Sequence, residues 1–204
     1  MSRFSWLHLT DLHFGQSGQG HLLHNVKERF FEDLKTLHGR TGPWDVVLFS
    51  GDFVQRGSQR EFDRLEAEVL GPLWAKMKEL GSEPKLLGVP GNHDLERPKK
   101  LNKPPAALRL LLLKDGFAQI ADEFFGKPKG EYRRIIDKAF ASYVAWWQNT
   151  PYRPQVVRNG LLPGEFSALL DLANGARVGV VGLNTTFLQL ADGNYTERLA
   201  LDVR

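Results

Sequence analysis

Cysteine is absent from the 204 residues of this chain. Its absence excludes disulfide bonds, thiolate zinc sites and a cysteine nucleophile. It also fits a reducing compartment, and we expect a cytoplasmic protein. The N-terminus lacks the apolar core of a signal peptide, and the longest apolar run, residues 108–113, is interrupted by Arg109. Since a membrane span needs about 20 apolar residues, we expect no membrane contact.

A strong excess of charge is absent as well, because 27 Lys and Arg residues face 24 Asp and Glu residues, for a formal net charge of +3. This balance permits an anionic substrate but supports nucleic-acid binding only weakly. The composition, 42% hydrophobic and 25% charged, is that of a globular domain. It excludes a disordered tail, a collagen-like fibre and a coiled-coil rod.

The first third of the chain alternates between strand-like and helix-like segments. Short apolar runs predict buried strands, and apolar residues at helical spacing predict the helices between them. A capping-box pair, Ser58 and Glu61, opens the second helix, which Gly71-Pro72 interrupts. The predicted strands cover residues 4–9, 44–49 and 85–89, and the predicted helices cover residues 22–37 and 58–81. This alternation indicates an α/β fold with a largely parallel sheet.

The middle of the chain has a different pattern. Helical stretches are expected at about 104–125 and 130–148, so we expect a helical insertion at about 95–150, or 95–154 with the loop that follows it. Beyond the insertion, two strand-like arms at 166–173 and 176–183 flank Asn174-Gly175, a pair typical of a tight hairpin turn.

Three short polar loops follow the predicted strands. They contain Asp11 and His13, then Gly51-Asp52, then Gly91-Asn92-His93-Asp94. Ligands of open α/β sheets bind where strands end at their carboxyl edges, so we expect these side chains to meet in one crevice. Carboxylates, a neutral imidazole and an amide oxygen are ligands for Mn²⁺, Fe²⁺, Zn²⁺ or Mg²⁺. Singly, Asp11 or Asp52 would be assigned to a helix cap or a turn. Together, these residues predict a metal centre.

The three loops, in this order, resemble the calcineurin-like metallophosphoesterases. The first signature blocks of that family are D-x-H, G-D and G-N-H-[DE], a few tens of residues apart. Here Asp52 follows Asp11 by 41 residues and Asn92 follows Asp52 by 40. The resemblance implies an α/β fold with a layered sheet core flanked by helices (α/β/β/α). It covers residues 4–94 well and residues 166–190 loosely, and the helical insertion has no motif to match.

The resemblance also implies a site for two divalent metal ions. Manganese is the leading candidate, and iron, zinc and magnesium are alternatives. Asp11 and His13 would hold the first ion, Asp52 would bridge both ions, and Asn92 would bind the second. Close approach of the loops to metal and phosphate would leave little room for a Cβ on their glycines.

Two further residues have catalytic roles implied by the resemblance. His93 would donate a hydrogen bond or a proton to the phosphate ester, and Asp94 would orient its other ring nitrogen. The expected partner is thus a phosphate-ester substrate, attacked by a hydroxide that the two metals activate. A phosphodiester, either a cyclic nucleotide or a nucleic acid, is favoured over a phosphoprotein.

Two later blocks of the family, a lone His and then G-H-x-H, are missing. The chain has six histidines, at positions 8, 13, 21, 24, 38 and 93. We therefore expect residues 1–204 to be the N-terminal two-thirds of a single metallophosphoesterase domain, incomplete at the C-terminus. Such a chain would hold at most one metal weakly and would be weak or inactive as an enzyme. The alternative is a non-catalytic or regulatory module of a larger multidomain protein, with an incomplete metal site.

Other polar and aromatic residues receive structural assignments. We expect His8 to be packed or partly buried in the first strand, and Trp146-Trp147 to anchor the insertion by packing. Ser50 and Thr10 flank the metal loops without a base at catalytic spacing, which argues against a serine nucleophile. The remaining histidines are expected to be solvated or to cap helix ends: His21, His24 and His38. The basic run after His93 is expected to be a solvated loop, with contact to a polyanionic substrate as the alternative: Arg97, Lys99, Lys100 and Lys103.

Overall fold

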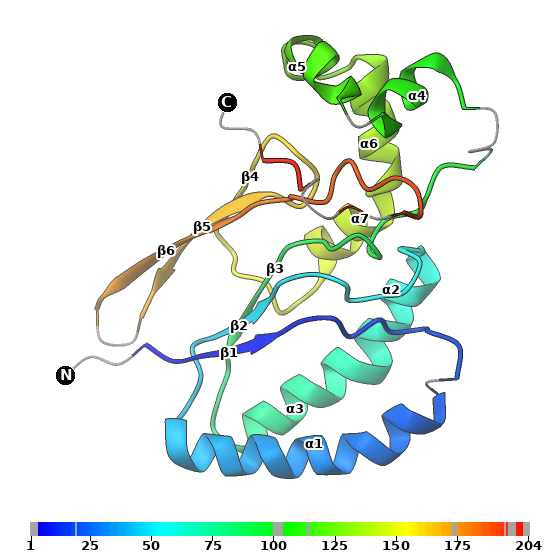
Figure 1. The fold of residues 1–204 in the computed structure, drawn as a ribbon. Helices are drawn as coiled ribbons and strands as arrows, with labels where there is room; N and C mark the ends of the chain where they lie inside the picture. Colours follow the sequence, from blue (N-terminus) through cyan, green and yellow to red (C-terminus); the bar gives the residue numbers. More distant parts are fainter. Residues whose placement is uncertain are drawn as a thin grey trace.

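The three strands predicted in the first third form one parallel sheet. The computed structural model describes residues 4–18, 20–99, 104–113, 115–172, 175–193, 195 and 199–201. Strands β1 (Trp6–Leu9) and β3 (Lys85–Gly88) flank β2 (Val46–Phe49). The register pairs the last residues of these strands, Leu9 with Phe49 and Phe49 with Gly88. The carboxyl ends of the strands are therefore level, and the loops that follow them start from the same edge (Figure 1).

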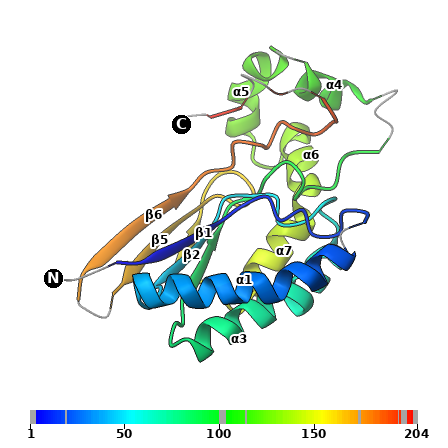
Figure 2. The same ribbon diagram turned by 60° about the horizontal axis from the view of Figure 1, so that its bottom comes forward.

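The helices of this first third cover one face of the sheet. Helix α1 (Gly20–Thr41, with side chains described from residue 26) and helix α3 (Gly71–Glu79) run along the same face in both views (Figures 1 and 2). Leu34 and Met77 from these helices are buried in a core cluster with Val47 of β2. The strand–helix alternation predicted from the sequence is confirmed.

A widened turn separates α3 from helix α2 (Gln59–Leu65), although both belong to one continuous helical segment. Ser58 caps α2 in the predicted capping box, since its backbone N–H donates to Glu61 Oε2 at 3.1 Å. Pro72 has no N–H and its ring would collide with the carbonyl four residues earlier. The preceding turn, η1 (Glu66–Leu70), is accordingly π-helical, and the Gly71 N–H donates to the Glu66 carbonyl.

A second, antiparallel sheet faces the other side of the core. Its order is β4 (Val157–Asn159), β5 (Phe166–Asp171) and β6 (Arg177–Gly182). Alternate residues of β5 are buried in the same core cluster as the parallel sheet, whereas Leu169 on its opposite face is 49% exposed. The chain therefore has the mixed α/β fold that was predicted, with two sheets and helices in layers.

The predicted hairpin of β5 and β6 is confirmed, although its strands pair over a shorter length than expected. The last strand pair is Asp171 with Arg177, and the Leu172 N–H donates to the Ala176 carbonyl at 2.9 Å. Gly175 of the predicted turn has a φ of 80°, an angle that glycine adopts readily. Asn174, half of that predicted turn, lies outside the described residues.

The helical insertion is present, but each predicted stretch is divided in two. The first contains α4 (Ala106–Leu112) and α5 (Gly116–Gly126), and the second contains α6 (Glu131–Ala139) and α7 (Ala141–Asn149). A Cβ on Gly116 would overlap the Leu110 carbonyl, so the chain turns tightly between α4 and α5. Phe140, with φ −97° and ψ 10°, breaks the second stretch.

Two aromatic residues of α7 join the insertion to helix α2 and to the antiparallel sheet, as predicted for Trp146-Trp147. The Trp146 ring stacks on Phe62 of α2 with centroids 5.2 Å apart, and Trp147 lies 5.6 Å from Phe166 of β5. The other helices of the insertion have their own apolar cluster, which also includes Leu95. Since Leu95 directly follows Asp94, the insertion packs beside the third of the polar loops.

Candidate metal centre

The polar loops after β1 and β2 are joined by backbone hydrogen bonds. The Asp11 N–H donates to the Gly51 carbonyl at 3.1 Å, and the His13 N–H donates to the Asp52 carbonyl at 2.9 Å. These bonds continue the pairing of the two strands beyond their ends, so the loops are held side by side. The sequence prediction that these loops meet at one edge of the sheet is confirmed for Asp11, His13 and Asp52.

All three of these residues have a left-handed backbone. Their φ angles are 55° for Asp11, 46° for His13 and 57° for Asp52, and among the described residues no other non-glycine residue has a positive φ. Such angles are uncommon for residues with a Cβ and cluster at functional sites, where the surrounding structure holds them in place. Three such residues in two neighbouring loops therefore indicate a functional site at this edge of the sheet.

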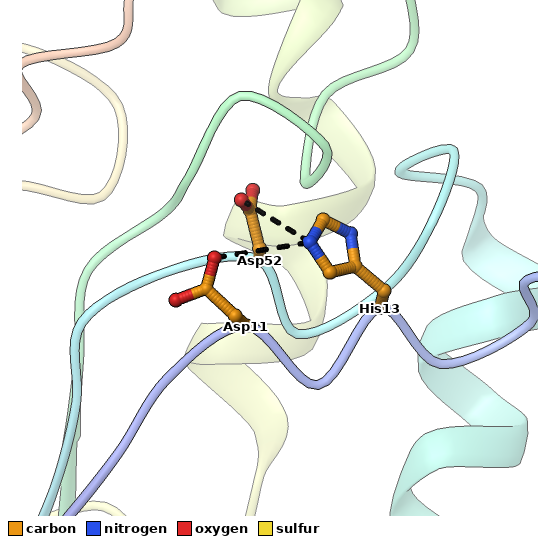
Figure 3. A group of neighbouring side chains, drawn as sticks. All are labelled: Asp11, His13 and Asp52. Atoms are coloured by element: carbon orange, nitrogen blue, oxygen red, sulfur yellow. Dashed lines mark ion pairs between the residues drawn. The ribbon is translucent and has the colours of Figure 1, made fainter.

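The three side chains converge on one point (Figure 3). The His13 Nε2 atom lies 3.8 Å from Asp11 Oδ1 and 3.8 Å from Asp52 Oδ2. One ligand atom from each residue lies within 4.8 Å of the other two. Two atoms bound to one divalent ion at about 2.1 Å lie roughly 3 to 4 Å apart, so the spacing suits a shared ion. Two carboxylates and an imidazole are also the donor set that such ions accept, and the residues fit a divalent metal.

Asp52 uses its two carboxylate oxygens differently. Oδ2 faces His13, whereas Oδ1 accepts the backbone N–H of His93 at 2.9 Å. The Asp52 side chain is 14% exposed and that of Asp11 is 63% exposed. Asp52 therefore connects the cluster to the third loop on its buried side. Asp11 lies on the solvent-exposed side of the cluster.

His93 lies beside the cluster, with its ring 4.6 Å from the His13 ring in an edge-to-face arrangement. The His93 Nδ1 atom is 3.0 Å from the Gln55 backbone oxygen and 3.2 Å from Gln55 Nε2. The prediction that Asp94 orients this ring is wrong, because Gln55 occupies that place. Sequence reasoning missed Gln55, whose only signal was its position in the loop that carries Asp52.

Asp94 instead holds the third loop against the second. Its carboxylate is fully buried and accepts the backbone N–H groups of Gly91 at 2.8 Å and Val54 at 2.9 Å. Burial raises the pKa of Asp94 from 3.8 to about 7, against the lowering effect of these hydrogen bonds. Asp94 thus has a structural role, because it connects the second and third loops by hydrogen bonds.

These features match a known family. The family model for calcineurin-like phosphoesterases matches residues 4–174, which is most of the chain and includes all three loops. The chain belongs to the calcineurin-like phosphoesterase family.

One curated relative is similar over part of its length. It is the 3',5'-cyclic adenosine monophosphate phosphodiesterase CpdA of Haemophilus influenzae, 33% identical over 132 residues. The match covers 61% of this chain and 44% of that protein. The chain therefore spans less than half of this relative. Within the described residues, no helix has the length and apolar character needed to cross a membrane.

Asn92, the remaining ligand implied by the family resemblance, is half-buried in the turn between Gly91 and His93. The backbone of this turn lies close to Asp52, since a Cβ on Gly91 would overlap Asp52 Oδ1 and the Asp52 backbone nitrogen. Gly91 is therefore needed for packing between the loops. The role of Asn92 as a metal ligand stays a prediction.

One assignment outside the family motifs is wrong. His8 is exposed rather than packed, and its Nε2 atom lies 2.8 Å from the Ser50 hydroxyl. Ser50 thus has an imidazole partner, which sequence reasoning did not find because the residues are 42 positions apart. His38 lies in the last turn of α1 and is half-buried against Trp44, with ring centroids 5.3 Å apart.

The basic run after His93 is only partly described. Arg97 forms an ion pair with Asp192 at 2.6 Å, so its charge is already matched. Lys99 is exposed, as expected, and Lys100 and Lys103 lie outside the described residues. The predictions for the side chains of His21 and His24 also lie outside them.

Proposed function

We propose that this protein is a metal-dependent phosphoesterase that hydrolyses a phosphodiester. The observation that carries the proposal is the convergence of Asp11, His13 and Asp52 at the carboxyl edge of a parallel sheet. A left-handed backbone at three non-glycine residues costs conformational free energy, and an ordinary turn would not require it. Membership of the calcineurin-like phosphoesterase family supports hydrolysis of a phosphate ester.

Asp11, His13 and Asp52 would hold the first metal ion, and Asp52 and Asn92 would share the second. A bound divalent ion supplies Lewis-acid chemistry and offsets the negative charge that develops on phosphate oxygens. Manganese is our first choice because a mixed set of carboxylate, imidazole and amide donors suits it. Iron, zinc and magnesium are the alternatives.

His93 would act on the substrate rather than on the metal. Its Nδ1–H can donate to the Gln55 carbonyl, which fixes the plane of the ring. A protonated ring then has its Nε2–H left to donate to an ester oxygen of the substrate. Gln55 thus takes over the orienting role that the sequence had assigned to Asp94.

A phosphodiester is proposed on the strength of the relative, whose name describes a cyclic-nucleotide phosphodiesterase. The residues after His93 give no support for nucleic acid, since Arg97 is engaged with Asp192. We also propose that the insertion at 95–154 belongs to the same domain, because its apolar cluster includes Leu162 and Phe187, which follow the insertion in the chain.

Metal titration and a hydrolysis panel test the proposal. Calorimetry of the chain with Mn²⁺, Zn²⁺ and Mg²⁺ should detect at least one bound ion that the Asp52→Ala variant does not bind. The panel compares bis-(p-nitrophenyl) phosphate, cyclic AMP and p-nitrophenyl phosphate in the presence of the tightest metal. Faster hydrolysis of the diesters is expected. A chain that binds no divalent ion would contradict the proposal. Slow turnover agrees with the weak enzyme expected from the sequence, whereas metal binding with no detectable turnover would favour the non-catalytic alternative.

A further inference from the structure

A cavity lies behind the turn that carries Asp11. It has a volume of about 230 Å³, is partly open to solvent, and is lined by the end of β1, by α1 and by the segment from η1 to α3. In both ribbon views α1 and α3 lie on the same face of the sheet (Figures 1 and 2). Leu9, Thr10 and Leu12 line the cavity, so its wall contains the residues on both sides of Asp11.

The interior of the cavity is apolar and aromatic. Phe30 and Phe31 of α1 face Phe49 of β2 and Leu73 of α3 across it. Apolar cavities in proteins stay dry and bind apolar rings, and one of about 150 Å³ accommodates benzene. The larger cavity here suits an apolar group of about two fused rings.

The rim of the cavity carries a cation. Lys27 lines it, with its Nζ atom 5.8 Å from the centroid of the Phe31 ring. Glu68 also lines the rim, but both of its oxygens accept from Arg64, at 2.8 Å and 3.0 Å. Within the part of the chain that the structure describes, no carboxylate pairs with Lys27. An anionic group at the rim would therefore meet an available ammonium.

We propose that this cavity is a second ligand site, which binds a small aromatic carboxylate with its rings inside and its carboxylate at Lys27. Aromatic burial would supply affinity, and Lys27 would favour an anion over a neutral molecule of the same shape. The site lies outside the proposed metal centre and does not depend on phosphoesterase activity.

The cavity is also connected to the metal centre through one hydrogen bond. Thr10 lines the cavity, and its hydroxyl donates to Asp11 Oδ2 at 2.7 Å. A ligand in the cavity would touch the same turn that presents Asp11 and His13. Binding of the ligand should therefore change the NMR signals of that turn even when no metal is present.

Titration with 2-naphthoate, followed by methyl NMR of the wild-type chain in EDTA, tests the proposal directly. EDTA removes metal ions that would otherwise bind the carboxylate. Saturable shifts of the Leu9, Leu12 and Leu73 methyl signals are expected. The neutral analogue 2-naphthalenemethanol should cause the same shifts at roughly two- to fivefold higher concentration, the usual range for an exposed ion pair.

Two charge variants of α1 separate the rim contact from general electrostatics. Lys27→Met should weaken 2-naphthoate binding by roughly two- to fivefold and leave the neutral analogue unaffected. Lys35→Met is the matched control, because Lys35 is an exposed lysine of the same helix that does not line the cavity. It should leave both affinities unchanged.

A filling variant, Val69→Phe, should abolish the methyl shifts, with circular dichroism as the check on folding. Should it unfold, the wild-type methyl shifts still decide. The proposal is overturned if 2-naphthoate causes no saturable shift of the three leucine methyl signals up to its solubility limit. Equal binding of naphthoate to the Lys27→Met variant and the wild type would overturn it as well.

Discussion

At the scale of single residues, Asp52 has the most demanding position in the molecule. One of its oxygens faces His13 and the other accepts the His93 N–H, while its own backbone is left-handed. It therefore places the third loop, and in the proposed centre it would bind metal as well. These two contributions can be separated by substitution.

Asp52→Ala should abolish metal binding and turnover, because it removes the most buried carboxylate of the cluster. Asp52→Asn should also lose most of its metal affinity, but its amide oxygen can still accept the His93 N–H. Metal content by mass spectrometry and the His93 amide shift by NMR measure the two effects. Normal metal content in Asp52→Ala would exclude the proposed centre.

His93→Gln should retain metal while turnover falls by roughly 10²- to 10⁴-fold, the usual contribution of an acid–base group. The reason is that the His93 ring contacts Gln55 and the edge of His13, rather than being one of the three converging ligands. Steady-state kinetics and metal analysis on the same sample check the prediction. Loss of metal from this variant would identify His93 as a ligand.

The buried carboxyl of Asp94 should make stability depend on pH. Its pKa is about 7 in the fold against an ordinary 3.8, so between these values the folded protein holds a proton that the unfolded chain has lost. The free energy of unfolding therefore falls as pH rises from about 4 to about 7, by a few kcal/mol at most at about 1.4 kcal/mol per unit of pKa.

Urea unfolding of the metal-free chain at several pH values between 5 and 8 measures this effect. The Asp94→Asn variant is the reference: it cannot titrate, and its stability should change less over the same range. It should also be less stable at low pH, because one of the two backbone N–H groups then faces an amide nitrogen. A wild type whose stability rises between pH 5 and pH 8 relative to this variant would contradict the raised pKa.

At the scale of elements, the loops fit together only because glycine stands at their contact points. A Cβ on Gly51 would lie 2.8 Å from the Gly91 backbone, and one on Gly91 would overlap Asp52. The sequence suggested that these glycines make room for metal and phosphate. In the structure, these glycines first of all allow the second and third loops to pack against each other.

Gly91→Ala should therefore lower both stability and metal affinity, since the second and third loops must move apart to accept the methyl group. Overpacking of this kind costs about 1–3 kcal/mol. Gly179→Ala in β6 is the matched control, because no atom lies within 4 Å of its added Cβ. Thermal unfolding and metal titration of both variants check the difference, and equal behaviour would show that the loops can relax.

Much of the secondary structure could be predicted from the sequence because local periodicity determines it. The strands at 4–9, 44–49 and 85–89, and the capping box at Ser58, depend on neighbouring residues alone. The division of the insertion into four helices and the π-helical turn before Pro72 were missed. They depend on tertiary packing, such as the approach of Gly116 to the Leu110 carbonyl.

The residues of the candidate site also differ in how far the sequence predicts them. Asp11, His13 and Asp52 could be placed together because parallel strands end at one edge. The partner of His93 could not be predicted, since Asp94 is its neighbour in the sequence, whereas Gln55 is 38 positions away and reaches the ring only in the folded loops. Ser50 and His8 show the same difficulty, since their contact joins two strands.

At the scale of the whole molecule, a metal ion in the proposed centre would add a further link between the loops after β1 and β2, which backbone hydrogen bonds already hold side by side. A ligand that binds only the folded state stabilises it in proportion to the logarithm of its concentration. Mn²⁺ at 100 times its dissociation constant should raise the free energy of unfolding by about 2.7 kcal/mol. Differential scanning calorimetry should detect a higher Tm in the wild type, whereas an unchanged Tm with saturating Mn²⁺ would contradict binding to the fold. Asp52→Asn should show little change.

The level carboxyl ends of β1, β2 and β3 also determine when the centre can exist during folding. Asp11 and Asp52 belong to segments that start far apart in the chain, and their loops meet only after the parallel strands have found their register. Parallel pairing closes long loops and is slow compared with helix formation. An early intermediate with α1, α2 and α3 formed would thus contain the helices of the first third and no metal site. A metal ion at the proposed centre would consequently bind last, and it would select chains whose parallel strands are already paired.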